Sequence, residues 1–284
     1  MWAAAWERLR RDRLTLTAGS VFLGLCLLAV LADAINAYAL QRDPNVQVLT
    51  ATYQGPSPAH WFGTDEYGRD SAARVIQASR VSLTMGFMVA AIALTVGVMA
   101  GLIAAQYGGW VDDLVTFVVN LFSITPTFYV LLILAAWVPP SLVSLALLIA
   151  AFGWMGVTRQ VRGVSLSIAR RDYVLAARAL GATDGRIMLR HVLPNVSSIV
   201  TIVAGLEVAG AILAESGLSF VGLGIRPPTP SWGNMLTNSL QYVFRDPWLV
   251  ILPGAFIFVT ILSVYLLADG LRDALDPRLR SDAL

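Results

Sequence analysis

The chain has 284 residues, of which 57% are hydrophobic and only 13% are charged, and its mean hydropathy is +0.68. Soluble domains carry about a quarter of charged residues, so this composition excludes a soluble fold and predicts an all-α integral membrane protein that crosses the lipid bilayer several times. The formal net charge is only +2, and we expect no nucleic-acid partner.

Several residue types are scarce or missing, and this excludes most enzyme classes. Every one of the 20 basic residues is arginine, so the chain can hold neither a P-loop lysine nor a catalytic or Schiff-base lysine. One cysteine, Cys26, and two histidines, His60 and His191, predict no internal disulfide and no metal site. We therefore expect no enzyme activity, no cofactor and no bound metal in this chain, and any ATP must be bound by another chain.

Four arginines precede the first apolar run, at residues 14–32. A cleavable signal peptide has a similar layout, with a basic start, an apolar stretch and small residues after it. The run of 19 residues is longer than the apolar core of a signal peptide and is long enough to span a bilayer. We predict a cytoplasmic segment at 1–13 and an uncleaved first span at 14–32, with the signal peptide as the alternative.

Five more apolar runs complete a prediction of six transmembrane helices. The predicted spans two to six are residues 81–106, 114–137, 142–157, 196–214 and 248–268, so that the core covers 81–268. With the first segment inside, the inner segments 1–13, 107–113, 158–195 and 269–284 hold 14 arginines, and the outer segments 33–80 and 215–247 hold 6. This asymmetry obeys the positive-inside rule and predicts that both termini and the 158–195 loop are cytoplasmic.

The outer segment 33–80 contains a run of turn-forming and acidic residues at 63–70. This run predicts a turn followed by a helix that Asp70 or Ser71 caps and that leads into the second span. The acids Asp65, Glu66 and Asp70 lack the ligand spacing of a calcium loop, so we do not predict a cation site here. The second outer segment, 215–247, is rich in glycine and proline, and its Trp232 is expected in the headgroup belt.

The second and third spans carry two different patterns. In the second, the small residues Ala93, Gly97, Gly101 and Ala105 recur every four positions and predict close packing against another helix. The third contains a polar cluster in its middle, which consists of Asn120, Ser123, Thr125 and Pro126 with Thr127. A proline kink whose freed carbonyls are satisfied by hydroxyl groups explains this cluster, and so does a water-lined translocation pathway; both remain open.

Two glutamates mark the fifth span and its exit. Glu207 lies inside the span, where a carboxylate costs several kcal/mol unless it is paired, hydrated or protonated. We assign it to the translocation pathway or to a subunit interface, with a protonated and structurally satisfied acid as the alternative. Glu215, at the exit of the span, is assigned to the pathway with it.

The segment 173–195 is amphipathic and carries arginines between long apolar runs. Tyr173, Ala176, Ala177 and Leu180 fall on one helical stripe. Gly181 occupies the position of a left-handed helix cap, and Thr183 is placed to cap a second short helix that ends near Val192. The pattern predicts a compact docking element of helix, glycine turn and helix; an amphipathic helix lying on lipid headgroups is the alternative.

The residues of this segment resemble the cytoplasmic "EAA" loop of ABC-transporter permeases, in which a Glu-Ala-Ala triplet precedes a glycine and later a Leu-Pro pair. Leu175 stands where the family usually has glutamate, and His191 stands where its general pattern has isoleucine. The resemblance implies that the segment couples to an ATPase. The residues expected in that coupling are Tyr173, Ala176, Ala177, Arg178, Gly181, Ala182, His191, Leu193 and Pro194.

Three more strings are similar to the C-type permease subunits of dipeptide and oligopeptide ABC importers: residues 63–70, 215–236 and 269–279. The resemblance implies a multi-pass permease of the bacterial cytoplasmic (inner) membrane. It further implies a second, B-type permease subunit, two ATP-binding subunits or domains that hold ATP and Mg, and an extracytoplasmic peptide-binding protein. Two other functions stay open: the same permease role for nickel or another small solute, and a stand-alone proton-coupled carrier that uses Glu207.

Overall fold

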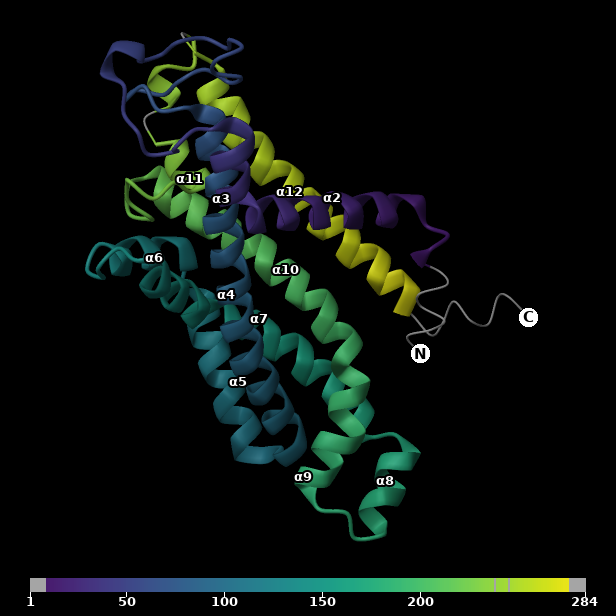
Figure 1. Cartoon of the computed structure of the whole chain (residues 1–284). Helices are drawn as coiled ribbons and strands as arrows, with labels where there is room; N and C mark the ends of the chain where they lie inside the picture. Colours follow the sequence, from purple (N-terminus) through teal and green to yellow (C-terminus); the bar gives the residue numbers. More distant parts are fainter. Residues whose placement is uncertain (1–8, 238, 245, 276–284) are drawn as a thin grey trace.

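The structure, a computed structural model, describes residues 9–237, 239–244 and 246–275. Within these ranges the chain is almost entirely helical, and its one extended pairing is an isolated bridge between Thr64 and Asp70. The long helices lie obliquely across one another in an elongated bundle (Figure 1). This confirms the predicted all-α membrane architecture.

Long helices carry the bundle, and short helical turns connect them. The longer elements are α2 (Arg13–Val30), α4 (Ser71–Tyr107), α5 (Gly109–Ile124), α6 (Thr127–Ala135), α7 (Leu142–Ala169), α10 (Leu193–Phe220) and α12 (Trp248–Leu275). The shorter helices are α3 (Ala32–Ala34), α8 (Asp172–Ala179), α9 (Asp184–Ile187) and α11 (Trp232–Met235). The remaining helical elements of the described chain are two π-helical turns, Ile35–Leu40 and Met188–Val192, and two 3-10 turns, Leu49–Ala51 and Ser239–Gln241.

Among the described residues, 5 helical stretches are long and apolar enough to cross a membrane, and the count rises to 6 if α5 and α6 form one bent span. Several helices continue beyond the apolar runs: α4 begins at Ser71, α7 ends at Ala169 and α10 ends at Phe220. Hydropathy marks the part of a helix that suits lipid, whereas the backbone hydrogen bonds continue into polar sequence. The helix ends therefore do not mark the membrane boundaries, and the spans given by the apolar runs stay a prediction.

The third predicted span, 114–137, is a broken helix. Its two parts, α5 and α6, meet at an angle of 80° across Thr125 and Pro126. Pro126 has no N–H to continue the hydrogen bonds of α5, and its fixed φ suits the start of a new helix. The break therefore follows from Pro126, as the kink interpretation expects.

Helices α4 and α7 pack closely where the small-residue stripe predicts a contact. A Cβ atom on Gly97 would lie 2.5 Å from Val157 Cβ, and one on Gly101 would lie 2.9 Å from the carbonyl oxygen of Thr158. Only glycine allows the two backbones to approach this far. A bidentate pair between Arg162 of α7 and Asp112 adds α5 to the same assembly.

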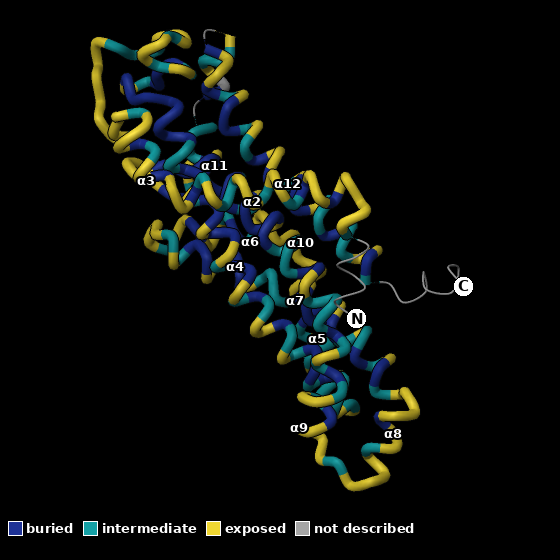
Figure 2. Tube along the Cα trace, turned by 45° about the vertical axis from the view of Figure 1, so that its right-hand side comes forward, coloured by how far each residue is buried: buried dark blue, intermediate teal, exposed yellow. Residues whose placement is uncertain are grey.

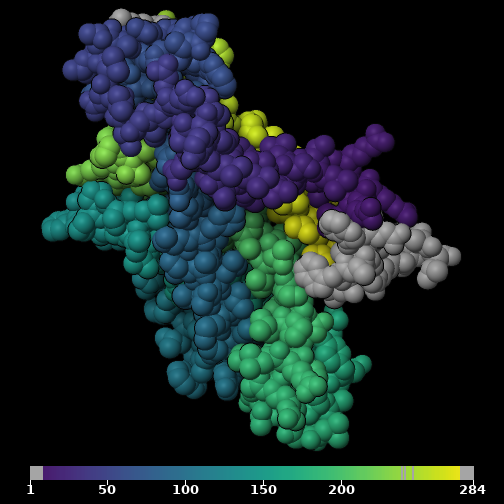
Figure 3. Space-filling view, in the orientation of Figure 1, coloured from purple at the N-terminus to yellow at the C-terminus, as the bar shows by residue number. Residues whose placement is uncertain are grey.

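The two ends of the bundle differ. Residues 41–70, 221–237 and 239–244 gather at one end, and α8 and α9 project at the opposite end (Figures 1 and 3). Burial follows the same division, because buried residues run along the centre of the bundle while α8 and α9 are mostly exposed (Figure 2). Connections between the ends run through α4, α7 and α10.

At the loop-rich end, the predicted start of α4 is confirmed. Asp70 is the N-cap, and its Oδ1 accepts from the Ala73 amide at 2.8 Å. No group of acids, histidines or cysteines suited to a metal ion occurs in the part of the chain that the structure describes. Trp232 was expected in the headgroup belt, and this expectation is wrong: its side chain is 0% exposed and its indole N–H donates to the Val75 carbonyl.

Candidate functional site

The segment predicted to dock a partner folds as a helix, a glycine turn and a second helix. Helix α8 ends at Ala179, and Gly181 then adopts a left-handed φ of +84°. Thr183 caps α9, and its hydroxyl accepts from the Arg186 amide at 3.4 Å. A residue with a Cβ atom is strained at such a φ, which explains glycine at this turn. Both caps are as the sequence predicts.

The second helix does not end at Val192. It passes through the π-helical turn Met188–Val192 directly into α10, so that Asp184–Phe220 forms one helical stretch of 37 residues. Pro194 lies in the first turn of α10, where it has no free N–H to offer the preceding turn. Pro194 therefore does not end the helical stretch, as its position at the start of α10 shows.

A buried cluster joins this segment to the long helices. Val174 of α8 and Ile187 of α9 are 0% exposed, and they pack with residues of α4, α7 and α10. The cluster consists of Leu102, Val157, Val161, Ile168, Val174, Ile187, Val192, Val196 and Val203. Such packing resists relative movement, because interiors are packed as densely as organic crystals. Helices α8 and α9 are therefore firmly packed against three long helices.

The outer side of the segment is uncovered, and exposed apolar side chains stand on it among charged ones such as Arg178 and Asp184. Tyr173, Leu175, Leu180 and Leu189 are 42%, 50%, 89% and 61% exposed. The predicted stripe of Tyr173, Ala176, Ala177 and Leu180 thus faces away from the bundle, and only Ala177 within it is partly buried. Hydropathy periodicity found the stripe but not its direction, because it cannot tell a face that packs inside the chain from one that packs on a partner.

The other residues expected in coupling make contacts within the segment or with the long helices. Arg178 lies 3.8 Å from Asp184, which also accepts from the Gln106 side chain of α4 at 2.7 Å. The rings of His191 and Tyr173 lie 6.3 Å apart. Ala182 and Leu193 are partly buried against the cluster. Gln106 was not singled out from the sequence, since its contact with Asp184 joins positions 78 residues apart.

The polar residues of the broken span lie on an uncovered surface. Residues 120–129 are all exposed, including Asn120, Thr125 and Pro126. Ser123 donates to the Val119 carbonyl at 2.6 Å and accepts from Arg159 of α7 at 2.7 Å. Around the bend this chain therefore leaves polar and aromatic side chains available to water, cargo or a second subunit.

The two predicted pathway glutamates differ in their surroundings. Glu207 of α10 is half-buried, and its carboxylate lies against α7, where a Cβ on Gly153 would be 2.9 Å from Oε2. Glu215 is 0% exposed, and its Oε1 accepts from Ser219 at 2.6 Å and from Ser231 at 2.8 Å. Glu215 thus holds the end of α10 to the loop before α11. It is enclosed by its own chain, whereas Glu207 lies beside the partly open face of α7.

The predicted site residues therefore form two groups. The coupling residues from 173 to 194 lie together at one end of the bundle (Figure 1). The candidate pathway residues are spread over α5, its bend and α10, and the structure does not bring Asn120, Glu207 and Glu215 into one site.

Comparison with known protein families gives two matches. Residues 97–281 match the family described as "Binding-protein-dependent transport system inner membrane component". Residues 1–56 match the "N-terminal TM domain of oligopeptide transport permease C".

Curated relatives align over nearly the whole chain. A dipeptide transport system permease protein, DppC, of Alkalihalophilus pseudofirmus is 35% identical over 99% of this chain and 91% of its own length. An oligopeptide transport system permease protein, OppC, of Mycobacterium bovis is 39% identical over 90% of each chain. The DppC protein of Bacillus subtilis is 36% identical over 97% of this chain and 85% of its own.

A solved structure shares the fold. One chain of the MetNI methionine ABC transporter in an inward-facing conformation superposes with a TM-score of 0.59, covering 72% of this chain and 97% of its own. Its sequence identity is 16%, so the likeness concerns the arrangement of the helices.

Proposed function

We propose, from the premise that this chain belongs to the family of inner-membrane components of binding-protein-dependent transport systems, that it is one permease subunit of an ATP-driven peptide importer. The chain is a multi-pass protein of the inner membrane. The cargo class rests on the curated relatives, which are dipeptide and oligopeptide permeases. Nickel transport and proton-coupled transport are not favoured by any of them.

One observation carries the coupling role: the apolar face of α8 and α9 is uncovered, while the other face is locked into the bundle. Leu180 is 89% exposed at the tip of this element, and Val174 behind it is 0% exposed. Exposed apolar side chains grouped in this way are typical of a protein interaction site. If a partner bound to this face moved, α8 and α9 would move with it as a rigid pair and would displace α4, α7 and α10.

We place the remaining partners by the same reasoning. An ATPase subunit or domain binds ATP and Mg and docks on α8 and α9, which puts that end and both termini in the cytoplasm. The uncovered bend of α5 and α6 faces a second, B-type permease subunit, so that the translocation pathway runs between the two. The loop-rich end then faces outward and receives the extracytoplasmic peptide-binding protein.

Transport follows from movement of the docked element. When two ATPases close on ATP, the α8–α9 element moves with them, and the buried cluster carries that movement into the long helices. The docked ATPase can shift the balance between inward and outward access only by the difference in its binding to the two states. The chain itself supplies no ATP chemistry in this scheme.

The test is purification of the tagged chain after co-expression with its genomic neighbours, followed by an ATPase assay with and without peptide-loaded binding protein. We expect copurifying ATPase activity that the loaded binding protein stimulates. Leu180→Asp should remove the ATPase and leave the second permease attached. Val46→Asp, which alters a 55% exposed residue at the other end, is the matched control and should retain both. A wild-type chain that purifies without any ATPase would refute the proposal.

A further inference from the structure

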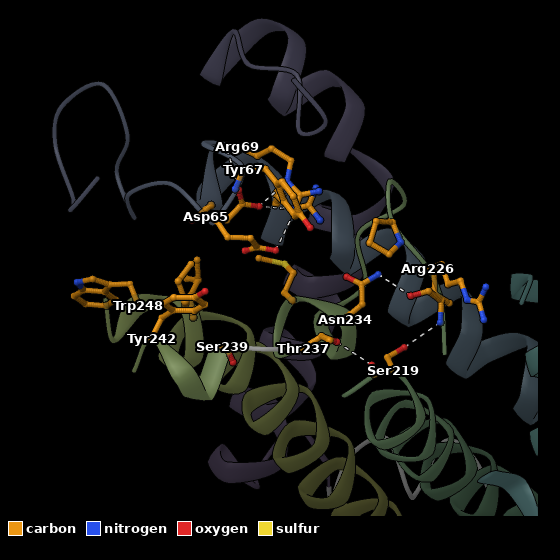
Figure 4. Close-up of a pocket in the computed structure, with 18 of the residues that line it drawn as sticks. Asp65, Tyr67, Arg69, Ser219, Arg226, Asn234, Thr237, Ser239, Tyr242 and Trp248 are labelled. Carbon is orange, nitrogen blue, oxygen red and sulfur yellow. Dashed lines mark hydrogen bonds and ion pairs between the residues drawn. The ribbon is translucent and has the colours of Figure 1, made fainter. Parts of the chain in front are cut away.

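A cavity of about 130 Å³ lies at the loop-rich end of the molecule. Residues just before and at the start of α4 form one wall, and residues from the end of α10, from α11 and from the start of α12 contribute to the other (Figure 4). No residue that we assign to coupling or to the pathway lines it. Three arginines line it: Arg226 is exposed, whereas the side chains of Arg69 and Arg74 are only 5% and 4% exposed.

Asp65 offsets only part of the positive charge of Arg69 and Arg74, and both of its carboxylate oxygens already accept hydrogen bonds. Its Oδ1 accepts from the amides of Tyr67 and Arg69, each at 2.9 Å. Its Oδ2 accepts from Arg69 Nε at 2.6 Å and lies 3.4 Å from Arg74 Nε. Asp65 thus has little capacity left for an entering cation, and the described residues hold no group of acids, histidines or cysteines suited to a metal ion.

The arginines, in contrast, retain donors. A guanidinium carries five N–H groups. Arg69 uses Nε on Asp65, and its face stacks on the Tyr67 ring with 4.5 Å between Cζ and the ring centroid. Arg74 donates through Nη1 to the Pro44 carbonyl at 3.1 Å. Apart from the approach of Glu66 Oε1 to Arg69 Nη2 at 3.6 Å, no further acceptor is found within the described chain for the other N–H groups of these two side chains.

A third donor on the same wall has no partner. The Ser71 side chain is 2% exposed, and its Oγ makes no hydrogen bond within the described chain. A buried hydroxyl without a partner costs free energy, so a ligand that accepts from it gains affinity. Ser71 is also the first residue of α4, a helix of 37 residues whose N-terminus favours negative charge.

The volume of the cavity and the apolar wall opposite the arginines limit which ligand fits. Pockets that enclose whole small molecules measure about 300–1,000 Å³, so this cavity admits one residue-sized group. Met235, Trp248 and Leu252 supply an apolar wall across from the arginines. Figure 4 shows Asp65 and Arg69 on one side of the cavity and Trp248 with Tyr242 on the other. We propose that this cavity binds a single carboxylate attached to a short apolar group, held by Arg69, Arg74 and Ser71.

Glu66 is the resident competitor for that position. Its Oε1 lies 3.6 Å from Arg69 Nη2, and its side chain is 36% exposed, so it can move outward when a carboxylate enters. Burial raises the pKa of Glu66 above its ordinary value, and its negative charge stands close to the position that an entering carboxylate would take. Removing this charge should therefore strengthen binding.

The test uses the full-length chain with its copurified partners in lipid nanodiscs. Binding of 4-methylpentanoate and of the uncharged 4-methylpentanamide is measured by calorimetry. We expect the acid to bind and the amide not to bind. Ser71→Ala should weaken binding of the acid about tenfold, which is the scale of one hydrogen bond to a charged group. Glu66→Gln should strengthen binding of the acid.

The control is Ser165→Ala, which removes another buried hydroxyl that has no partner in the described chain but lies in α7, away from the cavity. This variant should bind the acid as the wild type does. Equal binding of acid and amide, or an unchanged affinity in Ser71→Ala, would overturn the proposal. Neither result depends on whether peptide is transported, so failure here is distinct from failure of the proposed function.

Two sources could supply the carboxylate: an acidic side chain of a docked extracytoplasmic protein, or the C-terminus of a peptide. The first predicts that 4-methylpentanoate competes with docking of the binding protein and that Ser71→Ala weakens docking. The second predicts unchanged docking, and a raised KM of Ser71→Ala for free peptides but not for C-terminally amidated ones.

Discussion

Gly181 shows how one backbone angle can determine the geometry of an interface. Its φ of +84° lets the chain reverse between α8 and α9, and a Cβ atom there would meet nothing within 4 Å. Any effect of a small substitution therefore comes from the backbone and not from a steric clash. The apolar face depends on this turn, because the turn sets the angle between Leu180 on one side and Leu189 on the other.

We expect Gly181→Ala to strain the turn by about 1–2 kcal/mol and to reduce peptide uptake per ATP hydrolysed, while the chain still inserts and assembles. Gly185→Ala is the matched control, because its added Cβ also meets nothing within 4 Å and its φ is not left-handed. The measurement is the ratio of peptide uptake to ATP hydrolysis in proteoliposomes. Equal ratios for the two variants would show that the turn geometry does not matter for coupling.

At the scale of elements, the contact between α4 and α7 depends on two glycines. Gly97→Ala would place a Cβ 2.5 Å from Val157 Cβ, so one helix must shift. Overpacking of this kind typically costs about 1–3 kcal/mol. We expect a lower melting temperature for the detergent-solubilised chain. Gly210→Ala, where a Cβ meets nothing within 4 Å, should leave the melting temperature unchanged.

The bend between α5 and α6 allows a test of the second subunit's position. The one native cysteine, Cys26, can be replaced by alanine, and a single cysteine then placed at exposed Asn120. We expect this cysteine to cross-link to cysteines placed in the B-type subunit. A cysteine in place of Leu23 of α2, which is 60% exposed, should react only with lipid-soluble reagents. Cross-linking from position 23 but not from position 120 would contradict the proposal, because it would place the B-type subunit against α2 and not at the bend.

The sequence predicted elements better than it predicted their partners. Run length and caps located the helices, and the spacing of Gly97 and Gly101 predicted a close contact with another helix, which the structure identifies as α7. The burial of Trp232 could not be predicted, because its indole meets Val75 across 157 residues of sequence. The cavity could not be predicted for the same reason. Arg69, Ser71 and Arg74 are close in sequence, but only the fold brings Met235 and Leu252 next to them.

At the scale of the whole molecule, the stretch Asp184–Phe220 joins the docking end to the loop-rich end. It contains one irregularity, the π-helical turn Met188–Val192, immediately above the docking element. We expect the double substitution of exposed Leu189 and Arg190 by glycine to soften this turn, at about 1 kcal/mol per residue. Peptide uptake should then fall while ATP hydrolysis persists. The double alanine variant removes the same side chains without loosening the backbone and serves as the control; a matching loss there would assign the effect to the side chains.

The continuity of this stretch also has a mechanical consequence. At 1.5 Å per residue, its 37 residues form a rod roughly 55 Å long. If the rod pivots near its docked end, a tilt of about 10° moves its far end by about 10 Å. Because Glu215 fastens that far end to Ser231, the loop before α11 must travel with it. The stretch would thus act as a lever: a small displacement at the ATPase would produce a larger displacement at the end of the permease where cargo arrives.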